Sequence, residues 1–164
     1  MQVRLARGDD VSAIQSVGRK TWPTTYAFAG EDYIANGLTT WWSVEALERS
    51  LEATTCLVAD DGDQLVGMGN IDLRGEVPVI WKLYVVPESQ GLGVGSALMA
   101  GLIARVPSGT SSVRLEYLAG NERAARFYAA KQFNELRREP AERPGWPELV
   151  WVERRLEVAA PDRR

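Results

Sequence analysis

Three glycines, Gly91, Gly93 and Gly95, alternate within the segment SQGLGVGS. They separate a run typical of a strand from a run typical of a helix, and glycine weakens both kinds of element. Bare backbone at such a junction serves a sharp turn or a ligand that touches the main chain. Backbone N–H groups at a helix N-terminus, together with roughly half a positive charge from the helix dipole, bind phosphate groups. The segment therefore predicts a phosphate-binding turn, and a plain strand–helix turn is the alternative.

The spacing of these residues discriminates among known phosphate-binding patterns. A P-loop needs Lys and then Ser or Thr after its last glycine, but Ser96 and Ala97 stand there. A dinucleotide fingerprint needs a third glycine where Ser96 stands, and it opens directly after a strand, whereas Pro87 intervenes here. Gln90, Gly93 and Gly95 fit a third pattern, Gln/Arg-x-x-Gly-x-Gly/Ala, in which consecutive main-chain N–H groups wrap a pyrophosphate.

The titratable residues restrict the chemistry. The chain has no histidine and a single cysteine, Cys56. These absences exclude Ser-His-Asp and Cys-His nucleophilic schemes, a disulfide framework and most transition-metal sites, so we expect no metal. Cys56 lies in the apolar segment TTCLVA, where a lone cysteine is usually part of the core rather than a nucleophile. An acid or base must therefore be a carboxylate or a tyrosine.

Hydrophobic periodicity and turn residues predict the elements that position this turn. The expected strands cover residues 2–6, 79–86, 112–118 and 148–156, with a hairpin over 54–74 that turns at Asp61-Gly62. The expected helices start at the cap Asp9 or Asp10 and cover 43–52, 95–105 and 121–133. The aromatic segment 21–42 contains Pro23 and two glycines, which we expect to break any regular element there. The order predicts a mixed α/β fold with a right-handed crossover from the 79–86 strand to the 112–118 strand, if the two are parallel.

Length and composition indicate an ordinary globular chain. The 164 residues, 45% of them hydrophobic and 25% charged, predict one domain over 1–157 and a frayed tail over 158–164. A net charge of -3 gives no basic field for nucleic acid, and no apolar run is long enough for a membrane span. With no signal peptide recognisable at the start, we expect a cytoplasmic protein without a nucleic-acid or membrane partner.

Two segments carry a resemblance to a known family. LYVVPESQGLGVGSALM resembles the acetyl-CoA-binding motif of the GCN5-related N-acetyltransferases, the GNAT superfamily. RLEYLAGNERAARFYAAKQF, at the expected distance, is similar to the strand–Asn–helix–Tyr segment of that family. The order of elements agrees over nearly the whole chain. The resemblance implies an α/β (α+β) fold: a mixed central sheet of about six to seven strands with a splayed parallel pair, flanked by about four helices.

The resemblance also implies a site. Acetyl-CoA, a co-substrate, would lie where the strands over 83–86 and 113–118 splay apart, and its pantetheine arm would pair with main chain at Leu83, Tyr84 and Val85. Its pyrophosphate would be held by Gln90, Gly91, Leu92, Gly93, Val94, Gly95 and Ser96, and Asn121 would contact the cofactor arm. Tyr128 matches the tyrosine that faces the cofactor sulfur and acts as general acid. Glu116 matches a position that some members use as a base.

The sequence departs from the family pattern at two positions. Many members have Arg or Lys where Leu92 stands, so one phosphate partner is missing and weaker affinity is expected. The family often has glycine before the final phenylalanine of the second motif, as a left-handed helix cap. Gln132 stands there, before Phe133.

The resemblance implies direct acetyl transfer to an amine in a ternary complex, without an acetylated Cys56. The acceptor would enter opposite CoA, against the aromatic segment, where Trp22, Tyr26 and Tyr33 are candidate binding residues; packing of the core is the alternative. With Glu31 and Asp32 nearby, a cationic amine such as a polyamine fits, as do a peptide N-terminus, a lysine or an aminoglycoside-like amine. Asp72 or Glu31 could supply the base through water instead of Glu116. A non-catalytic acyl-CoA sensor of the same fold is the alternative function, and a homodimer is left open.

Overall fold

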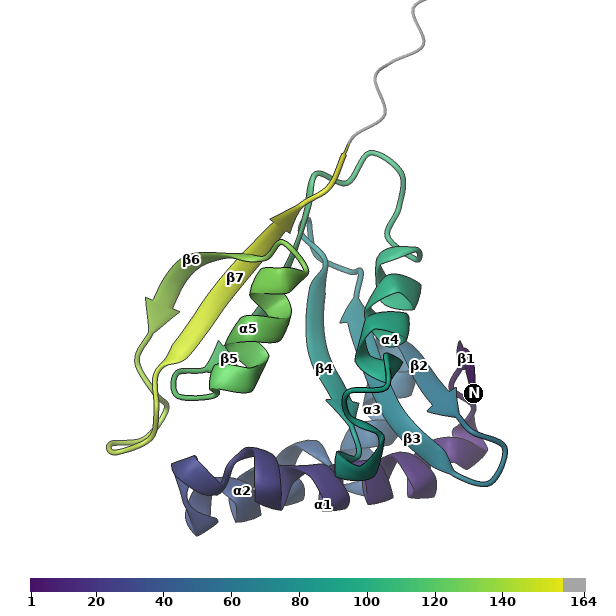
Figure 1. Ribbon diagram of the computed structural model, residues 1–164, viewed down its shortest axis with the longest axis horizontal. Helices are drawn as coiled ribbons and strands as arrows, with labels where there is room; N and C mark the ends of the chain where they lie inside the picture. Colours follow the sequence, from purple (N-terminus) through teal and green to yellow (C-terminus); the bar gives the residue numbers. More distant parts are fainter. Residues whose placement is uncertain (158–164) are drawn as a thin grey trace, which may run out of the picture.

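The computed structural model describes residues 1–157 (Figure 1). The strands are β1 (Gln2–Leu5), β2 (Thr55–Asp60), β3 (Leu65–Asp72), β4 (Val79–Val85), β5 (Ser112–Leu118), β6 (Asn134–Glu139) and β7 (Leu149–Arg155). The helices are α1 (Val11–Thr25), α2 (Glu31–Trp41), α3 (Val44–Ala53), α4 (Val94–Ile103) and α5 (Glu122–Ala130). Short 3-10 turns occupy Gly8–Asp10, Ala27–Ala29 and Pro87–Ser89.

The strands form one mixed sheet in the order β1-β2-β3-β4-β5-β7-β6. Its parallel pair, β4 and β5, is joined only through Val79 with Arg114 and Ile80 with Leu115. Beyond Ile80 the two strands diverge, whereas β4 continues its pairing with β3, and β5 with β7. The predicted mixed sheet with a splayed parallel pair is therefore confirmed.

The helices cover the sheet on both faces. α4 packs on β1 to β4 from one side, and α1 and α3 pack on the other, with α4 in front of the sheet and α3 behind it in Figure 1. α1 and α2 lie across the end at which β4 and β5 diverge (Figure 1). α5 rests on the β5–β7 part, where Tyr128 stacks on Tyr117 with ring centroids 6.0 Å apart. The fold thus builds a wedge-shaped separation inside the sheet, with helices around it.

The prediction that segment 21–42 lacks regular structure is wrong. α1 continues through Pro23 to Thr25, and α2 follows after Gly30. Pro23 is exposed and lies in the last turn of α1, so the hydrogen bond that it removes is near the helix end. Burial of Trp22 on the same turn favours continuing the helix to this point.

The sequence analysis also missed one strand, β6, with the sequence NELRRE. Five of its six residues are exposed because it is an edge strand that pairs only with β7. Its sequence therefore shows no alternation of apolar and polar residues. The predicted tail, 158–164, lies outside the described residues. Among the helices of residues 1–157, none has the length and apolar character of a membrane span.

Candidate active site

Two cavities meet where β4 and β5 diverge. The larger, of about 820 Å³, is called here the aromatic cavity, because its walls include Trp22, Tyr26, Tyr33, Trp41, Trp81, Tyr84, Tyr117, Trp146 and Trp151. The smaller, of about 440 Å³, is the glycine-turn cavity, with walls that include Leu83, Val85, Gly91, Gly93, Gly95, Ser96, Asn121, Phe127 and Tyr128. The residues that line both are Tyr26, Trp81, Lys82, Tyr84, Glu116 and Tyr117. Two ligands that entered from different sides would meet at these shared residues.

The glycine turn exposes main chain to the smaller cavity. Gly91 and Gly93 have φ of 79° and 85°, in the left-handed region that side chains other than glycine rarely adopt. Gly93 is the N-cap of α4, so no side chain caps the first turn of that helix. The N–H groups of Val94, Gly95 and Ser96 therefore have no acceptor within the helix. A Cβ on Gly91 or Gly93 would meet no atom within 4 Å, so the space beside the turn is open.

One edge of β4 faces the same cavity. The Val86 N–H donates to the Val66 carbonyl at 2.9 Å, so Val86, Tyr84 and Lys82 direct their backbone groups toward β3. By the alternation of a strand, Leu83 and Val85 direct theirs into the separation between β4 and β5. The Gln90 side-chain amide donates to the Val85 carbonyl at 3.0 Å. This hydrogen bond does not involve the Val85 N–H.

Glu116 stands at the junction of the two cavities. It lies on β5, is half-buried and lines both spaces. Burial raises the pKa of its carboxyl group; the neighbouring carboxylates of Glu139 and Glu142 add to the shift, and Arg137 opposes it. A carboxylate with a raised pKa, held at the meeting point of two cavities, can accept a proton from a ligand.

Tyr128 reaches the glycine-turn cavity from α5. Its ring lies between Tyr117, with which it stacks, and Phe133 at 5.9 Å between centroids. Burial raises the pKa of its phenol. The hydroxyl group is therefore protonated at neutral pH and is a proton donor.

The aromatic cavity has rigid walls. Trp22 stacks on Tyr33 at 5.6 Å between centroids, and the hydroxyl groups of Tyr26 and Tyr84 lie 2.8 Å apart in a hydrogen bond. Burial raises the pKa of Tyr33 to about 12 and also raises those of Tyr26 and Tyr84. All three phenols stay neutral at physiological pH. Trp22 and Tyr26 belong to the core and also line the cavity, so packing of the core accounts for part of this cluster.

A family model described as the acetyltransferase (GNAT) family matches residues 15–133, more than half of the chain. The chain belongs to this family. A comparison with curated proteins finds no significant match.

Solved structures share the GNAT fold over almost the whole chain. The PaiA N-acetyltransferase of Thermoplasma acidophilum, in complex with coenzyme A, has a TM-score of 0.78 and 20% identity, over 95% of this chain and 100% of that one. The ribosomal-protein-S18-alanine N-acetyltransferase of Escherichia coli has a TM-score of 0.76 and 17% identity, over 98% and 97%. At these identities the similarity concerns the fold.

Residues of the two GNAT motifs lie around the glycine-turn cavity. The glycine turn and the Leu83–Val85 edge line one cavity together with Tyr128, Glu116 and Asn121. The Asn121 side chain caps α5 by accepting the Ala124 N–H at 3.2 Å. Leu92, where many GNAT members carry a cation, is 75% exposed. Gln132 adopts φ of 69°, so the left-handed conformation of the family glycine is kept without glycine.

The alternative bases fit this GNAT site less well than Glu116. Asp72 lines the aromatic cavity, but Arg74 and the Trp81 indole hydrogen-bond it, and the Arg74 guanidinium holds its pKa at about 2. Glu31 and Asp32 line neither cavity. Cys56 is buried in β2, and burial raises its pKa to about 12, as expected of a core thiol.

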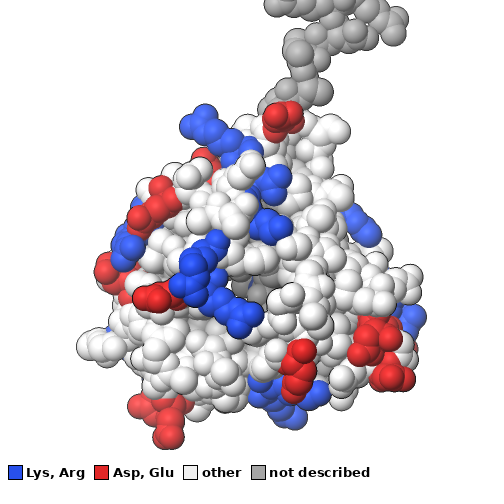
Figure 2. Space-filling view, in the orientation of Figure 1, with Lys and Arg blue, Asp and Glu red and all other residues white. Residues whose placement is uncertain are grey.

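Two cavity residues were missed by the sequence analysis of this acetyltransferase. Arg123 of α5 lines the glycine-turn cavity. On the face of the molecule that Figure 2 shows, Lys and Arg side chains border a hollow. Arg123 follows Asn121 by two residues, and this proximity in the sequence could have indicated that it lines the cavity. Lys82 lines both cavities, and its place one residue before Leu83 could have found it. Within residues 1–157, no group of three His, Cys, Asp or Glu side chains is arranged to hold a metal ion.

Proposed function

We propose that this protein transfers an acetyl group from acetyl-CoA to a primary amine by direct attack in a ternary complex. The observation that carries the proposal is the meeting of the two cavities at Glu116, between the glycine turn and the aromatic walls. A reaction between two bound molecules needs such a meeting point, because catalysis requires both to be held in contact.

The glycine-turn cavity fits coenzyme A on two counts. The uncapped first turn of α4 offers N–H donors and a positive dipole end to a pyrophosphate, with open space at Gly91 and Gly93. The backbone groups of Leu83 and the Val85 N–H offer strand-like hydrogen bonds to the amide groups of a pantetheine arm, whereas the Val85 carbonyl already accepts from Gln90. In this proposal the residues from Gln90 to Ser96 hold the phosphates, and Tyr84 and Asn121 complete the wall.

Glu116 and Tyr128 have complementary roles in the proposed reaction. Glu116, directly or through water, takes the proton that the amine loses as the new N–C bond forms. Tyr128 supplies a proton to the sulfur as the C–S bond of the thioester breaks. In the proposed reaction the Val85 N–H stabilises the negative charge that develops on the carbonyl oxygen. No covalent enzyme intermediate is needed, which agrees with the burial of Cys56.

The aromatic cavity is the proposed acceptor site, with Trp22, Tyr26 and Tyr33 in its wall. The T. acidophilum and E. coli relatives are named as N-acetyltransferases, and the second acts on an alanine of a ribosomal protein. A small-molecule amine or a peptide amine is the corresponding acceptor class here.

Calorimetry with CoA, followed by thiol release from acetyl-CoA with a broad panel of amines, tests the proposal. Tyr128→Phe is expected to slow release at least about tenfold, because a positioned general acid typically contributes about 10²–10⁴-fold. CoA affinity should change little. Tyr117→Phe, which removes the hydroxyl group of the stacked neighbour, is the matched control and should retain most of the rate.

The results separate the possible functions. No CoA binding at millimolar concentrations would refute the assignment. Tight binding without acceptor-dependent release from any amine would favour a sensor of acyl-CoA. Full activity of the Tyr128→Phe protein would remove Tyr128 from the mechanism.

A further inference from the structure

One end of the aromatic cavity is polar and is not explained by the proposed chemistry. This polar end consists of Arg49, Ser50, Thr54, Asn70 and Lys82, from α3, β3, β4 and the residue that precedes β2. The opposite wall carries three carboxylates, Glu116, Glu139 and Glu142. The cavity therefore has a basic end and an acidic end.

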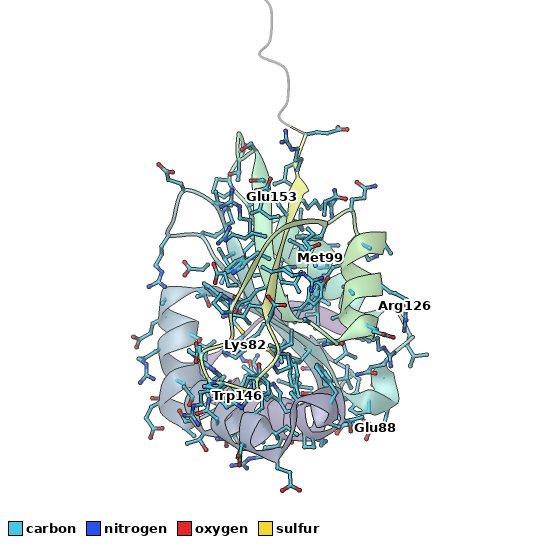
Figure 3. All side chains as sticks on the ribbon, turned by 90° about the vertical axis from the view of Figure 1, so that its left-hand side faces the viewer. Lys82, Glu88, Met99, Arg126, Trp146 and Glu153 are labelled. Atoms are coloured by element: carbon cyan, nitrogen blue, oxygen red, sulfur yellow. The ribbon has the colours of Figure 1, made fainter. Side chains whose placement is uncertain are left out.

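Lys82 is the central group of the polar end. Its side chain points to the same face of β4 as that of Tyr84, and its Nζ lies 5.5 Å from the centre of the Trp42 ring. Figure 3 shows Lys82 on the side of the molecule where Trp146, another residue of the aromatic cavity, also lies. Within residues 1–157 no carboxylate forms an ion pair with Lys82. Burial lowers the pKa of its ammonium group, as expected for a cation without an anionic neighbour.

Asn70 supplies a second, independent observation. It is 2% exposed and lies directly beside Lys82 in the pairing of β3 with β4. Its amide nitrogen donates to the Thr54 hydroxyl at 3.1 Å, but its Oδ1 has no hydrogen-bond partner. A buried polar atom without a partner is unfavourable, because it has lost its contact with water and gained no hydrogen bond in return. Asn70 lines the aromatic cavity, where a donor group of a ligand would supply the missing partner; the indole nitrogens of Trp22 and Trp151, residues of the same wall, also lack one.

The neighbouring charges cannot fill this role. Asp72 is engaged by Arg74 at 2.8 Å. The shift of the Glu116 pKa comes from burial, Glu139, Glu142 and Arg137, whereas that of Lys82 comes from burial and Cys56. No ion pair joins Lys82 to Glu116 within residues 1–157, so each end can receive a charge of opposite sign.

We infer that the acceptor is an amino acid or a related amine with a carboxylate, which binds to Lys82 while its amine faces Glu116. Asn70 Oδ1 accepts an N–H or O–H group of the same molecule. The inference rests on the proposed acetyl transfer and narrows its acceptor class. It disfavours the polyamines suggested by Glu31 and Asp32, because an all-cationic chain would place a like charge beside Lys82.

Matched pairs of acceptors test the inference. Thiol release from acetyl-CoA is measured with phenylalanine and phenethylamine, tryptophan and tryptamine, and glutamate and 4-aminobutyrate. Binding of the same compounds to CoA-saturated protein is measured by calorimetry. In the first two pairs only one member has a carboxylate, and in the third one member lacks the α-carboxylate. The wild-type protein should prefer the member with the additional carboxylate in at least one pair.

Variants of Lys82 test whether this side chain causes the preference for the acceptor with the additional carboxylate. A hydrogen bond to a charged group contributes about 1.5–3 kcal/mol, which corresponds to roughly 10- to 150-fold in affinity. Lys82→Met should weaken binding of the preferred carboxylate by that factor and leave its partner compound unaffected, whereas Lys82→Arg should retain part of the preference. Lys20→Met, at an exposed lysine outside both cavities, is the control and should behave as wild type.

Equal responses within every pair, including no response to either member, would overturn the inference. So would a preference that survives unchanged in Lys82→Met. Failure of the proposed function is distinguishable, since it appears as loss of CoA binding or as absence of thiol release with every amine.

Discussion

Replacement of Gly37 by alanine tests how the helices build the aromatic cavity, the proposed acceptor site. Gly37 lies on α2 against the ring of Trp22, and an added Cβ would stand 1.9 Å from Trp22 Cζ3. Ordinary contact requires about 3.4 Å or more, so the ring must move by roughly 1.5 Å. Trp22 is 5% exposed and packs against Tyr26 at 4.4 Å and Tyr33 at 5.6 Å between centroids, so it has little room to move.

The expected cost follows from two opposing effects. Overpacking of a core costs about 1–3 kcal/mol and occasionally more, and the overlap here is severe. Alanine is preferred over glycine in a helix by about 1 kcal/mol, which offsets part of that cost. We expect a net loss of about 2 kcal/mol in the free energy of unfolding. For a chain of this size the loss corresponds to a fall in Tm of about 4–8 °C.

Denaturant unfolding and thermal unfolding of the ligand-free protein measure this effect. Gly95→Ala in α4 is the matched control, because its Cβ would meet Phe127 at an ordinary 3.5 Å. That variant should be as stable as wild type or slightly more stable. Gly37→Ala should also bind CoA nearly normally and lose affinity for the acceptor, because the displaced ring belongs to the aromatic cavity alone. A Gly37→Ala protein at or above wild-type stability would show that the Trp22 packing has been misread.

Three further predictions concern charge. Because burial raises the pKa of Glu116 above its usual 4.5, the wild-type rate should fall with decreasing pH through an inflection above 4.5, and this acid limb should vanish in Glu116→Gln; an unchanged pH–rate profile would assign the base elsewhere. Arg123→Met should weaken CoA binding by up to about fivefold at low salt and less at high salt, whereas Arg126→Met, on the same helix but outside the cavity, should not; equal affinities would exclude Arg123 as a phosphate partner. Asp10 accepts hydrogen bonds from Arg4 at 2.8 and 3.0 Å and from the Arg7 N–H at 2.7 Å, and Arg4 above all lowers its pKa below 3.8. Its contribution, about 2 kcal/mol, is present above pH 3.8 and lost as the pH falls through the lowered value, so wild type and Asp10→Asn should differ in unfolding free energy at pH 7 and converge in acid.

The glycine turn before α4 could be predicted from the sequence because its requirements are local. Gly91 and Gly93 adopt left-handed conformations, and that requirement is visible as glycine in the chain itself. The open edge of β4 follows only from the family resemblance, which implies a splayed parallel pair, because the residues of the strand itself do not indicate where its pairing with β5 stops. Gln132 keeps the left-handed conformation with a less suitable residue, so its geometry could be anticipated from position but not from residue type.

The aromatic cavity, the proposed acceptor site, could not be predicted in the same way because segments far apart in the chain build it. α1 contains Pro23 and α2 contains Gly37, because burial of Trp22 outweighs the low helix propensity of these two residues. The sequence prediction for this segment rests on that propensity. Lys82 and Asn70 are neighbours only through the pairing of two strands. No spacing along the chain shows that a lysine will lack an anion or that an amide oxygen will lack a donor.

The two residue pairs that join β4 to β5 have a consequence for association in solution. A strand edge at the surface is a template on which another chain can add a strand and begin to aggregate. Here the edges of Leu83 and Val85 face inward, with α1 and α2 across the opening. With these helices beside it, the edge is less accessible to a strand of another molecule than the outer edges of the sheet at β1 and β6 are. The unpaired backbone groups of β4 thus lie inside the sheet, where a small ligand would meet them more readily than another copy of the protein.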